Sequence, residues 1–150
     1  MQEALLAFVH FSAVLGWVVF ASAQAALCRA EWVNAAVVRR LVRLDVILWV
    51  ATAAVLLTGL ARTQWGAKGA AWYWGNGLLH LKLALFTAAV VLMWGTTRRL
   101  RGWLRQLDQD SRTLPTAGNL RATRHRIMWA THLIALVPLA AVFLARGFGV

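Results

Sequence analysis

Long apolar stretches separated by short polar segments dominate the pattern of this chain. Four stretches can be read, at approximately 4–28, 38–61, 78–97 and 126–145. About 18 apolar residues are enough to cross the roughly 30 Å hydrocarbon core of a bilayer as a helix. Strands of a membrane barrel would instead alternate apolar and polar residues. The pattern therefore predicts an all-α fold, an integral membrane four-helix bundle in which residues 1–150 form a single transmembrane domain.

The composition supports a membrane location. Hydrophobic residues make up 61% of the 150 positions and charged residues only 14%, whereas about a quarter of the residues of a soluble domain are charged. A soluble core is therefore disfavoured. The first stretch also lacks the basic n-region of a signal peptide, so we interpret it as a retained helix.

Basic residues gather in two of the three connections between the expected helices. The first and third connections hold four and eight arginines, at positions 29, 39, 40 and 43, and at 98, 99, 101, 105, 112, 121, 124 and 126. Short cytoplasmic segments of membrane proteins collect Lys and Arg. Both connections are thus predicted to be cytoplasmic, and both termini to lie on the outer (periplasmic) side of a bacterial inner membrane. Topology and anionic lipid account for the net charge of +11, so no nucleic-acid partner is expected.

Several kinds of site are excluded by the residue inventory. Cys28 is the single cysteine, so neither a disulfide within the chain, a Cys-based zinc site nor the C-x-x-C-H attachment of a c-type haem is available. The chain has no Gly-rich phosphate loop, nucleophile elbow or H-E-x-x-H pair. Its five carboxylates disfavour a hydrolase built on paired acids. Whether the protein is an enzyme stays open.

Two histidines lie inside the expected spans, where ionisable groups are costly and often functional. His10 is about two turns into the first helix and His80 is near the start of the third, so both rings are expected at similar depth. A single metal or haem iron could then be bound by both. The alternative is that each ring only bonds to a neighbouring helix. His132 and His125 lie toward the other ends of the spans and could not reach the same iron.

Small, polar and aromatic residues share a helical face with each of these histidines. On the first helix the face comprises His10, Ala13, Val14, Trp17, Ala21 and Gln24, and on the third His80, Ala84, Thr87, Val91 and Trp94. Asp45, Trp49, Thr52 and Gly59 form the matching stripe on the second helix, where Asp45 could pair with Arg43. Small residues beside a ligand leave room for a flat macrocycle, although ordinary helix packing prefers them as well.

Four short motifs run through the first three spans: His10 through Gly16-Trp17, Arg39-Arg40-Leu41-Val42-Arg43, Thr58-Gly59 and Leu79-His80-Leu81-Lys82-Leu83. Together they resemble the HemJ-type protoporphyrinogen IX oxidases and, more loosely, the membrane domain of CopD-type copper-resistance proteins. The resemblance covers roughly the first 95 residues. Met93-Trp94 stands where that family has a second histidine of the third helix, and the ending Ala145-Arg146-Gly147 looks like a related group of uncharacterised bacterial membrane proteins.

The resemblance implies a bound haem b, with His10 as a ligand and His80 as its candidate partner. Trp17, on the face of His10, is included among the cofactor-binding residues. The anionic haem propionates would then need cations near the outer surface, where Arg62, Lys68 and Lys82 are available. Lys82 is two positions from His80, about 200° around the helix, so its flexible stem would have to turn back toward the same site.

The function expected from this resemblance is redox chemistry or electron transfer to a quinone or a related carrier. A porphyrin is the alternative substrate, as in protoporphyrinogen oxidation. A non-catalytic bundle that anchors or assembles a partner complex, or forms a homodimer, is the alternative from another class. A copper-handling protein ranks last, because Met1, Met93 and Met128 form no cluster with Cys28 in the sequence.

Overall fold

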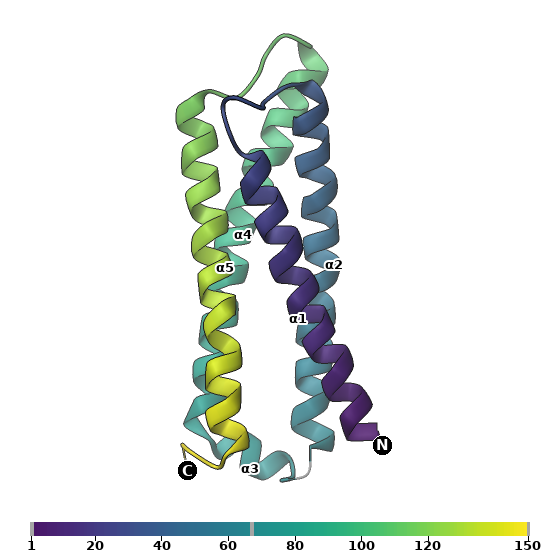
Figure 1. Ribbon diagram of the computed structural model, residues 1–150, viewed down its shortest axis with the longest axis vertical. Coiled ribbons are helices and arrows are strands. Elements are labelled where there is room, and N and C mark those ends of the chain that lie inside the picture. Colours follow the sequence, from purple (N-terminus) through teal and green to yellow (C-terminus); the bar gives the residue numbers. More distant parts are fainter. Residues whose placement is uncertain (1, 67, 150) are drawn as a thin grey trace.

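Long helices running side by side make up the computed structural model, which describes residues 2–66 and 68–149 (Figure 1). Its elements are α1 (Gln2–Leu27), α2 (Ala35–Trp65), the short α3 (Ala70–Gly75), α4 (Gly77–Gln109) and α5 (Ala117–Ala145). Within the described ranges there is no strand, and four of the helices are long and apolar enough to cross a membrane. The all-α bundle of membrane helices is thus confirmed.

The packing order places α1 and α4 on opposite corners of the bundle. Helix α1 packs against α2 and α5, and α4 packs against the same two helices, while the described parts of α1 and α4 do not contact each other. Both termini and α3 lie at one end, called here the terminal end (Figure 1). The α1–α2 and α4–α5 connections lie at the other, called the arginine-rich end.

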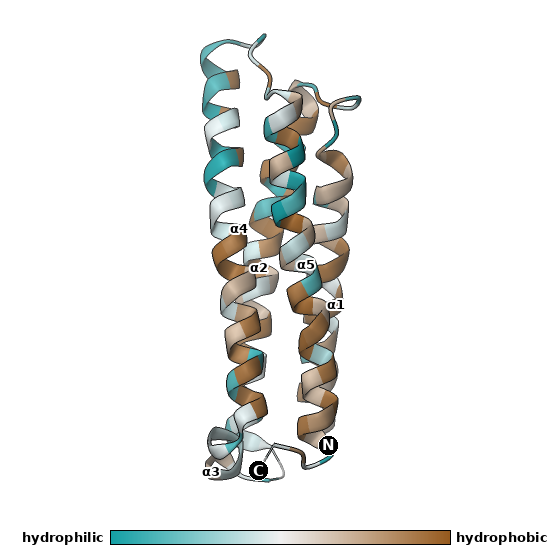
Figure 2. Ribbon diagram, turned by 90° about the vertical axis from the view of Figure 1, so that its left-hand side faces the viewer, coloured by the Kyte–Doolittle hydropathy of each residue, from teal (hydrophilic) through white to brown (hydrophobic). Residues whose placement is uncertain are grey.

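The helices extend beyond the apolar stretches, mainly at the arginine-rich end. Helix α4 continues about three turns past the expected end of its span, to Gln109, and this extension is hydrophilic in Figure 2. Arg39 of α2 and Asp108 of α4 form an exposed ion pair there, with an N–O distance of 3.5 Å. Hydropathy marks the part of a helix that fits in lipid, but the helix itself continues until its backbone groups meet a cap or water.

Side-chain caps start three of these helices. Asn34 accepts a hydrogen bond from the backbone of Val37, Asn76 from Leu78, and Thr116 from Asn119. At the terminal end, the side-chain amide of Asn76 also donates to the carbonyl of Phe148 at 3.0 Å. This bond fastens the C-terminal segment over the start of α4.

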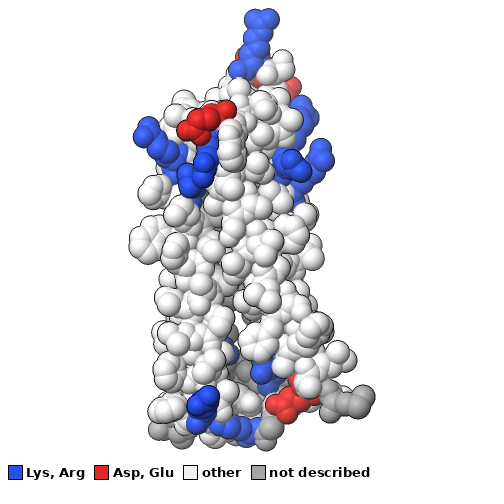
Figure 3. Space-filling view, viewed as in Figure 1, with Lys and Arg blue, Asp and Glu red and all other residues white. Residues whose placement is uncertain are grey.

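The apolar core follows the length of the bundle, and Trp17 is the largest of its fully buried side chains among the described residues. The indole of Trp17 donates to the hydroxyl of Thr52 at 3.0 Å, joining α1 to α2. On the face shown in Figure 3, charged side chains gather toward both ends and leave an uncharged band between them. That distribution fits a protein whose middle is surrounded by hydrocarbon.

Candidate functional site

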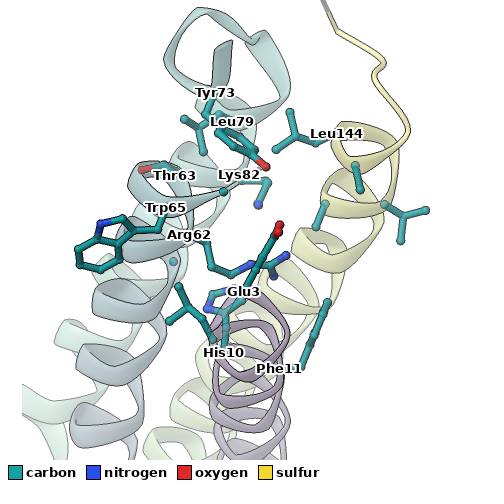
Figure 4. A pocket seen from close by; sticks show the side chains of 16 residues that line it. Glu3, His10, Phe11, Arg62, Thr63, Trp65, Tyr73, Leu79, Lys82 and Leu144 are labelled. Carbon is teal, nitrogen blue, oxygen red and sulfur yellow. The ribbon is translucent and has the colours of Figure 1, made fainter. Parts of the chain in front are cut away.

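A cavity of about 260 Å³ opens between the helices at the terminal end. We call it the His10 cavity; Figure 4 shows its polar residues pointing inward from several helices. All four long helices and α3 contribute to its lining, which includes Glu3, Leu6, His10, Phe11, Gly59, Arg62, Thr63, Tyr73, Leu79, Lys82, Ala141 and Leu144. A smaller cavity of about 60 Å³ shares His10, Gly59, Thr63, Leu79 and Lys82 with it and is otherwise mainly apolar.

The imidazole of His10 is held in one orientation by α2. Its Nδ1 lies 2.8 Å from the hydroxyl oxygen of Thr58. That hydroxyl can donate its one proton to the carbonyl of Ala54 at 2.6 Å or to that of Val55 at 3.3 Å; in either arrangement it accepts from His10, with the ring proton on Nδ1. The Nε2 atom then keeps its lone pair, as required of a metal ligand or a base.

Gly59 allows this close approach of the ring to α2. A Cβ at this position would lie 3.3 Å from Cε1 of His10, which is tighter than an ordinary contact. Gly59 therefore leaves room for the imidazole, and Thr58 provides its hydrogen-bond partner. The motif Thr58-Gly59 is explained locally by the packing of one histidine.

Two basic side chains share the cavity with His10. Arg62 lies one turn after Thr58 on α2, and its guanidinium stacks over Phe11, 5.5 Å from the ring centre. Lys82 of α4 lines both cavities and is directed inward in Figure 4. The carboxylate of Glu3, also on the lining, points toward them. The cavity thus presents an imidazole and two cations, with a carboxylate near its opening and apolar walls.

The structure does not bring His80 to this site. Its side chain is exposed, its Nδ1 donates to the carbonyl of Asn76 at 3.1 Å, and it lines neither cavity. The reason is rotational: Leu79, Lys82, Leu83 and Phe86 form the inward face of α4, and a residue about 200° from Lys82 must face outward. The face expected to surround His80 is accordingly exposed at Ala84, Thr87, Val91 and Trp94.

Other residues expected near a cofactor lie elsewhere. Trp17 is 1% exposed and packs in the core with its indole bonded to Thr52, away from the cavity lining. His125 and His132 share an exposed face of α5 with Met128 and Trp129, and the Nδ1 of His132 lies 2.6 Å from the carbonyl of Met128. Neither of these histidines lines the His10 cavity.

Sequence reasoning named Arg62 and Lys82 but missed Glu3, Tyr73 of α3 and the contact of Thr58 with His10. Glu3 precedes His10 by seven residues, so the two-turn spacing on one helix face was a usable signal. Tyr73 enters from α3, a helix too short to be recognised from hydropathy. Within residues 2–66 and 68–149, no three His, Cys, Asp or Glu side chains come together as a metal site.

Comparison with known proteins identifies the family of the chain. No curated protein and no solved structure matches the sequence. Residues 2–149 match the family described as predicted membrane protein (DUF2214), and the chain therefore belongs to this family of membrane proteins.

Proposed function

We propose that the protein binds a b-type haem in the His10 cavity and serves in electron transfer to a quinone or a related carrier. The observation that carries the proposal is the imidazole of His10, whose Nδ1 lies 2.8 Å from the Thr58 hydroxyl, inside a cavity that Arg62 and Lys82 also line. The resemblance to the HemJ-type proteins supports the same cofactor. A bacterial cytoplasmic membrane, with the terminal end facing outward, is the location that we propose.

The chemistry of the cavity fits this group in three respects. Histidines that bind metals usually donate their other ring N–H to a neighbouring oxygen, as His10 does to Thr58. Arg62 and Lys82 would supply charge-assisted hydrogen bonds for the two propionates. The apolar wall formed by Leu79, Leu83 and Phe86 suits the ring system. When bound, haem iron would supply one-electron chemistry that the side chains of this chain lack.

The dimensions set a condition on the proposal. A volume of about 260 Å³ is below the roughly 300–1,000 Å³ of ordinary small-molecule sites, so the helices must separate further to admit a macrocycle. Helices α1 and α5 already diverge toward the terminal end (Figure 1), which is the side from which a flat ligand would enter. With His80 facing outward, we propose that His10 is the histidine of this chain that would bind the iron.

Absorption spectroscopy tests the proposal. Protein purified in mild detergent from haem-replete cells should show a Soret band and reduced-minus-oxidised α and β bands. His10→Ala should remove most of the bound haem, while the matched variant His132→Ala, changed on the exposed face of α5, should keep it. A colourless wild-type protein, or a His10→Ala variant with an unchanged spectrum, would overturn the proposal.

A charge variant tests where the propionates bind. Lys82→Gln should weaken haem retention by about tenfold, because a hydrogen bond to a charged group contributes roughly 1.5–3 kcal/mol. Lys68 is the matched control, since it is exposed at the same end and stacks on Trp72 at 4.1 Å. Equal retention by Lys82→Gln and Lys68→Gln would place the propionates elsewhere.

A further inference from the structure

A second ionisable site lies in the other half of the bundle and is independent of the His10 cavity. Asp45 of α2 is 2% exposed, in a helix that is apolar enough to cross a membrane. Its carboxyl does not form the expected pair with Arg43: the hydroxyl of Thr97 on α4 lies 3.0 Å from its Oδ1. Burying a carboxyl inside a membrane-spanning helix costs free energy, so such a group is a candidate for function.

Thr97 stands at the centre of a small hydrogen-bond network. Its hydroxyl oxygen accepts from the indole N–H of Trp49 at 2.9 Å. Its single proton has two acceptors in range, Oδ1 of Asp45 at 3.0 Å and the carbonyl of Met93 at 3.1 Å. Because a hydroxyl donates only one hydrogen bond, the Thr97 proton must be directed to one of these two oxygens at a time.

The two orientations match the two protonation states of Asp45. When the Thr97 hydroxyl donates to the carboxyl, this hydrogen bond stabilises Asp45 as an anion. When it turns to the carbonyl of Met93, its second lone pair can accept a proton donated by a neutral Asp45, while Trp49 keeps the first. Neither state leaves the carboxyl or the hydroxyl without a partner, so the network accommodates a change of one proton without rearranging the helices.

The surroundings of the carboxyl contain few charges. From α1 it faces the neutral amide of Gln24, whose Nε2 donates to the carbonyl of Leu41 at 3.3 Å. From α4, Arg101 is the charged group that acts on it, one turn after Thr97 and exposed. Helix α5 does not pack against α2. Among the described residues Asp45 forms no salt bridge, since the pair that is present joins Arg39 to Asp108.

We propose that Asp45 and Thr97 form a reversible proton-binding site. An O–H bond forms at the Asp45 carboxyl as a proton arrives from water, the negative charge is lost, and no group is oxidised or reduced. Thr97 is a positioning residue, which supplies a donor to the anion and an acceptor to the acid. The ligand of this site is the proton itself, so the proposal does not depend on haem.

Infrared spectroscopy of the full-length protein in lipid, recorded over the pH range in which it stays folded, tests the site. A C=O band of a protonated carboxyl should gain intensity as the pH falls and should be absent from Asp45→Asn. Asp108→Asn, which removes an exposed carboxyl, should keep the band. Thr97→Val should shift the band toward that of a carboxyl with fewer hydrogen bonds, whereas Thr97→Ser should leave it in place.

Three results would overturn the proposal. The first is the absence of any pH-dependent carboxyl band in the folded wild type, which would mean that Asp45 does not exchange a proton. The second is a band of constant intensity at every pH, which would mean a permanently neutral acid. The third is a band that survives in Asp45→Asn. If Asp45→Asn fails to fold, the Thr97→Val and Thr97→Ser pair gives the same decision, because a band that is identical in both variants contradicts the role of the hydroxyl.

Discussion

The Nδ1 of His10 lies 2.8 Å from the hydroxyl oxygen of Thr58, and this hydroxyl also lies within hydrogen-bond distance of the carbonyls of Ala54 and Val55 on its own helix. One contact between α1 and α2 therefore holds the imidazole in place at the wall of the cavity. The packing of two helices and the chemistry of the ring are set by the same pair of residues.

Replacing Thr58 with valine should weaken haem binding without removing the ligand. Valine keeps the branched shape but cannot accept from Nδ1, so the ring loses its fixed tautomer and orientation. Loss of such an outer partner typically costs 10–100-fold in metal affinity, and we expect a decrease of that order in haem affinity measured by titration. Thr63→Val is the control, because Thr63 lines the cavity but bonds to the carbonyl of Leu60. Equal affinities in the two variants would contradict this role of Thr58.

The four histidines should differ in what their loss does to the absorption spectrum. His10→Ala should release haem, whereas His80→Ala, His125→Ala and His132→Ala should retain it, because these three side chains are exposed and lie outside the cavity. A five-coordinate wild-type spectrum, unchanged in His80→Ala, fits a single axial histidine. If His80→Ala instead converted a six-coordinate spectrum to a five-coordinate one, α4 would have to rotate in the haem-bound protein, and the pairing expected from the sequence would hold.

The number of membrane-spanning helices could be predicted because hydropathy marks the segments that fit in lipid, whereas the short α3 gives no such signal. The inward faces of α1 and α2 were also predictable: Val14, Trp17, Ala21 and Gln24 are buried, as are Asp45 and Thr52. On these helices the polar and aromatic residues that define the face bond to each other across the interface. A face that contains its own partners can be recognised from one sequence.

The rotation of α4 could not be predicted in the same way. His80 and Lys82 are about 200° apart around the helix, so only one of them can face the bundle. Both are ionisable groups that are costly to expose to lipid, so the sequence alone predicts an inward position for each. In the structure Lys82 is the one that faces inward, on the same side of α4 as Leu79, Leu83 and Phe86. In lipid, apolar residues are equally acceptable on either side, so hydrophobicity does not show which face is buried.

Trp17 should matter for stability and leave the cofactor unaffected. Trp17→Phe removes the indole N–H that donates to Thr52, and interhelical hydrogen bonds in membranes contribute on average about 0.6 kcal/mol, with a maximum of about 1.7. We expect a loss within that range, together with some lost packing, in unfolding titrations with SDS. Trp129→Phe is the control, because Trp129 is 64% exposed. A changed Soret band in Trp17→Phe would instead place the tryptophan next to the haem.

Cys28 should be almost unreactive in the folded protein. It is 1% exposed, and burial raises the pKa of its thiol to about 12, which the positive charge of Arg124 only partly opposes. At pH 8 the reactive thiolate is then roughly 1,000-fold scarcer than for an ordinary thiol. Labelling with a water-soluble maleimide should be slow in mild detergent and should become fast after SDS is added. Fast labelling of the folded protein would show that the α1–α2 junction opens.

Because the native Cys28 should not react, labelling of introduced cysteines can test the orientation of the bundle in the membrane. Gln64→Cys lies at the terminal end of α2 and Ser111→Cys in the connection after α4, and both positions are exposed. Because Lys and Arg are retained on the cytoplasmic side, and the arginines concentrate at the end that carries Ser111, a membrane-impermeant maleimide applied to intact spheroplasts should label Gln64→Cys. Ser111→Cys should react only after lysis. The opposite pattern would place the His10 cavity on the cytoplasmic side, and labelling of both variants before lysis would indicate that the chain inserts in two orientations.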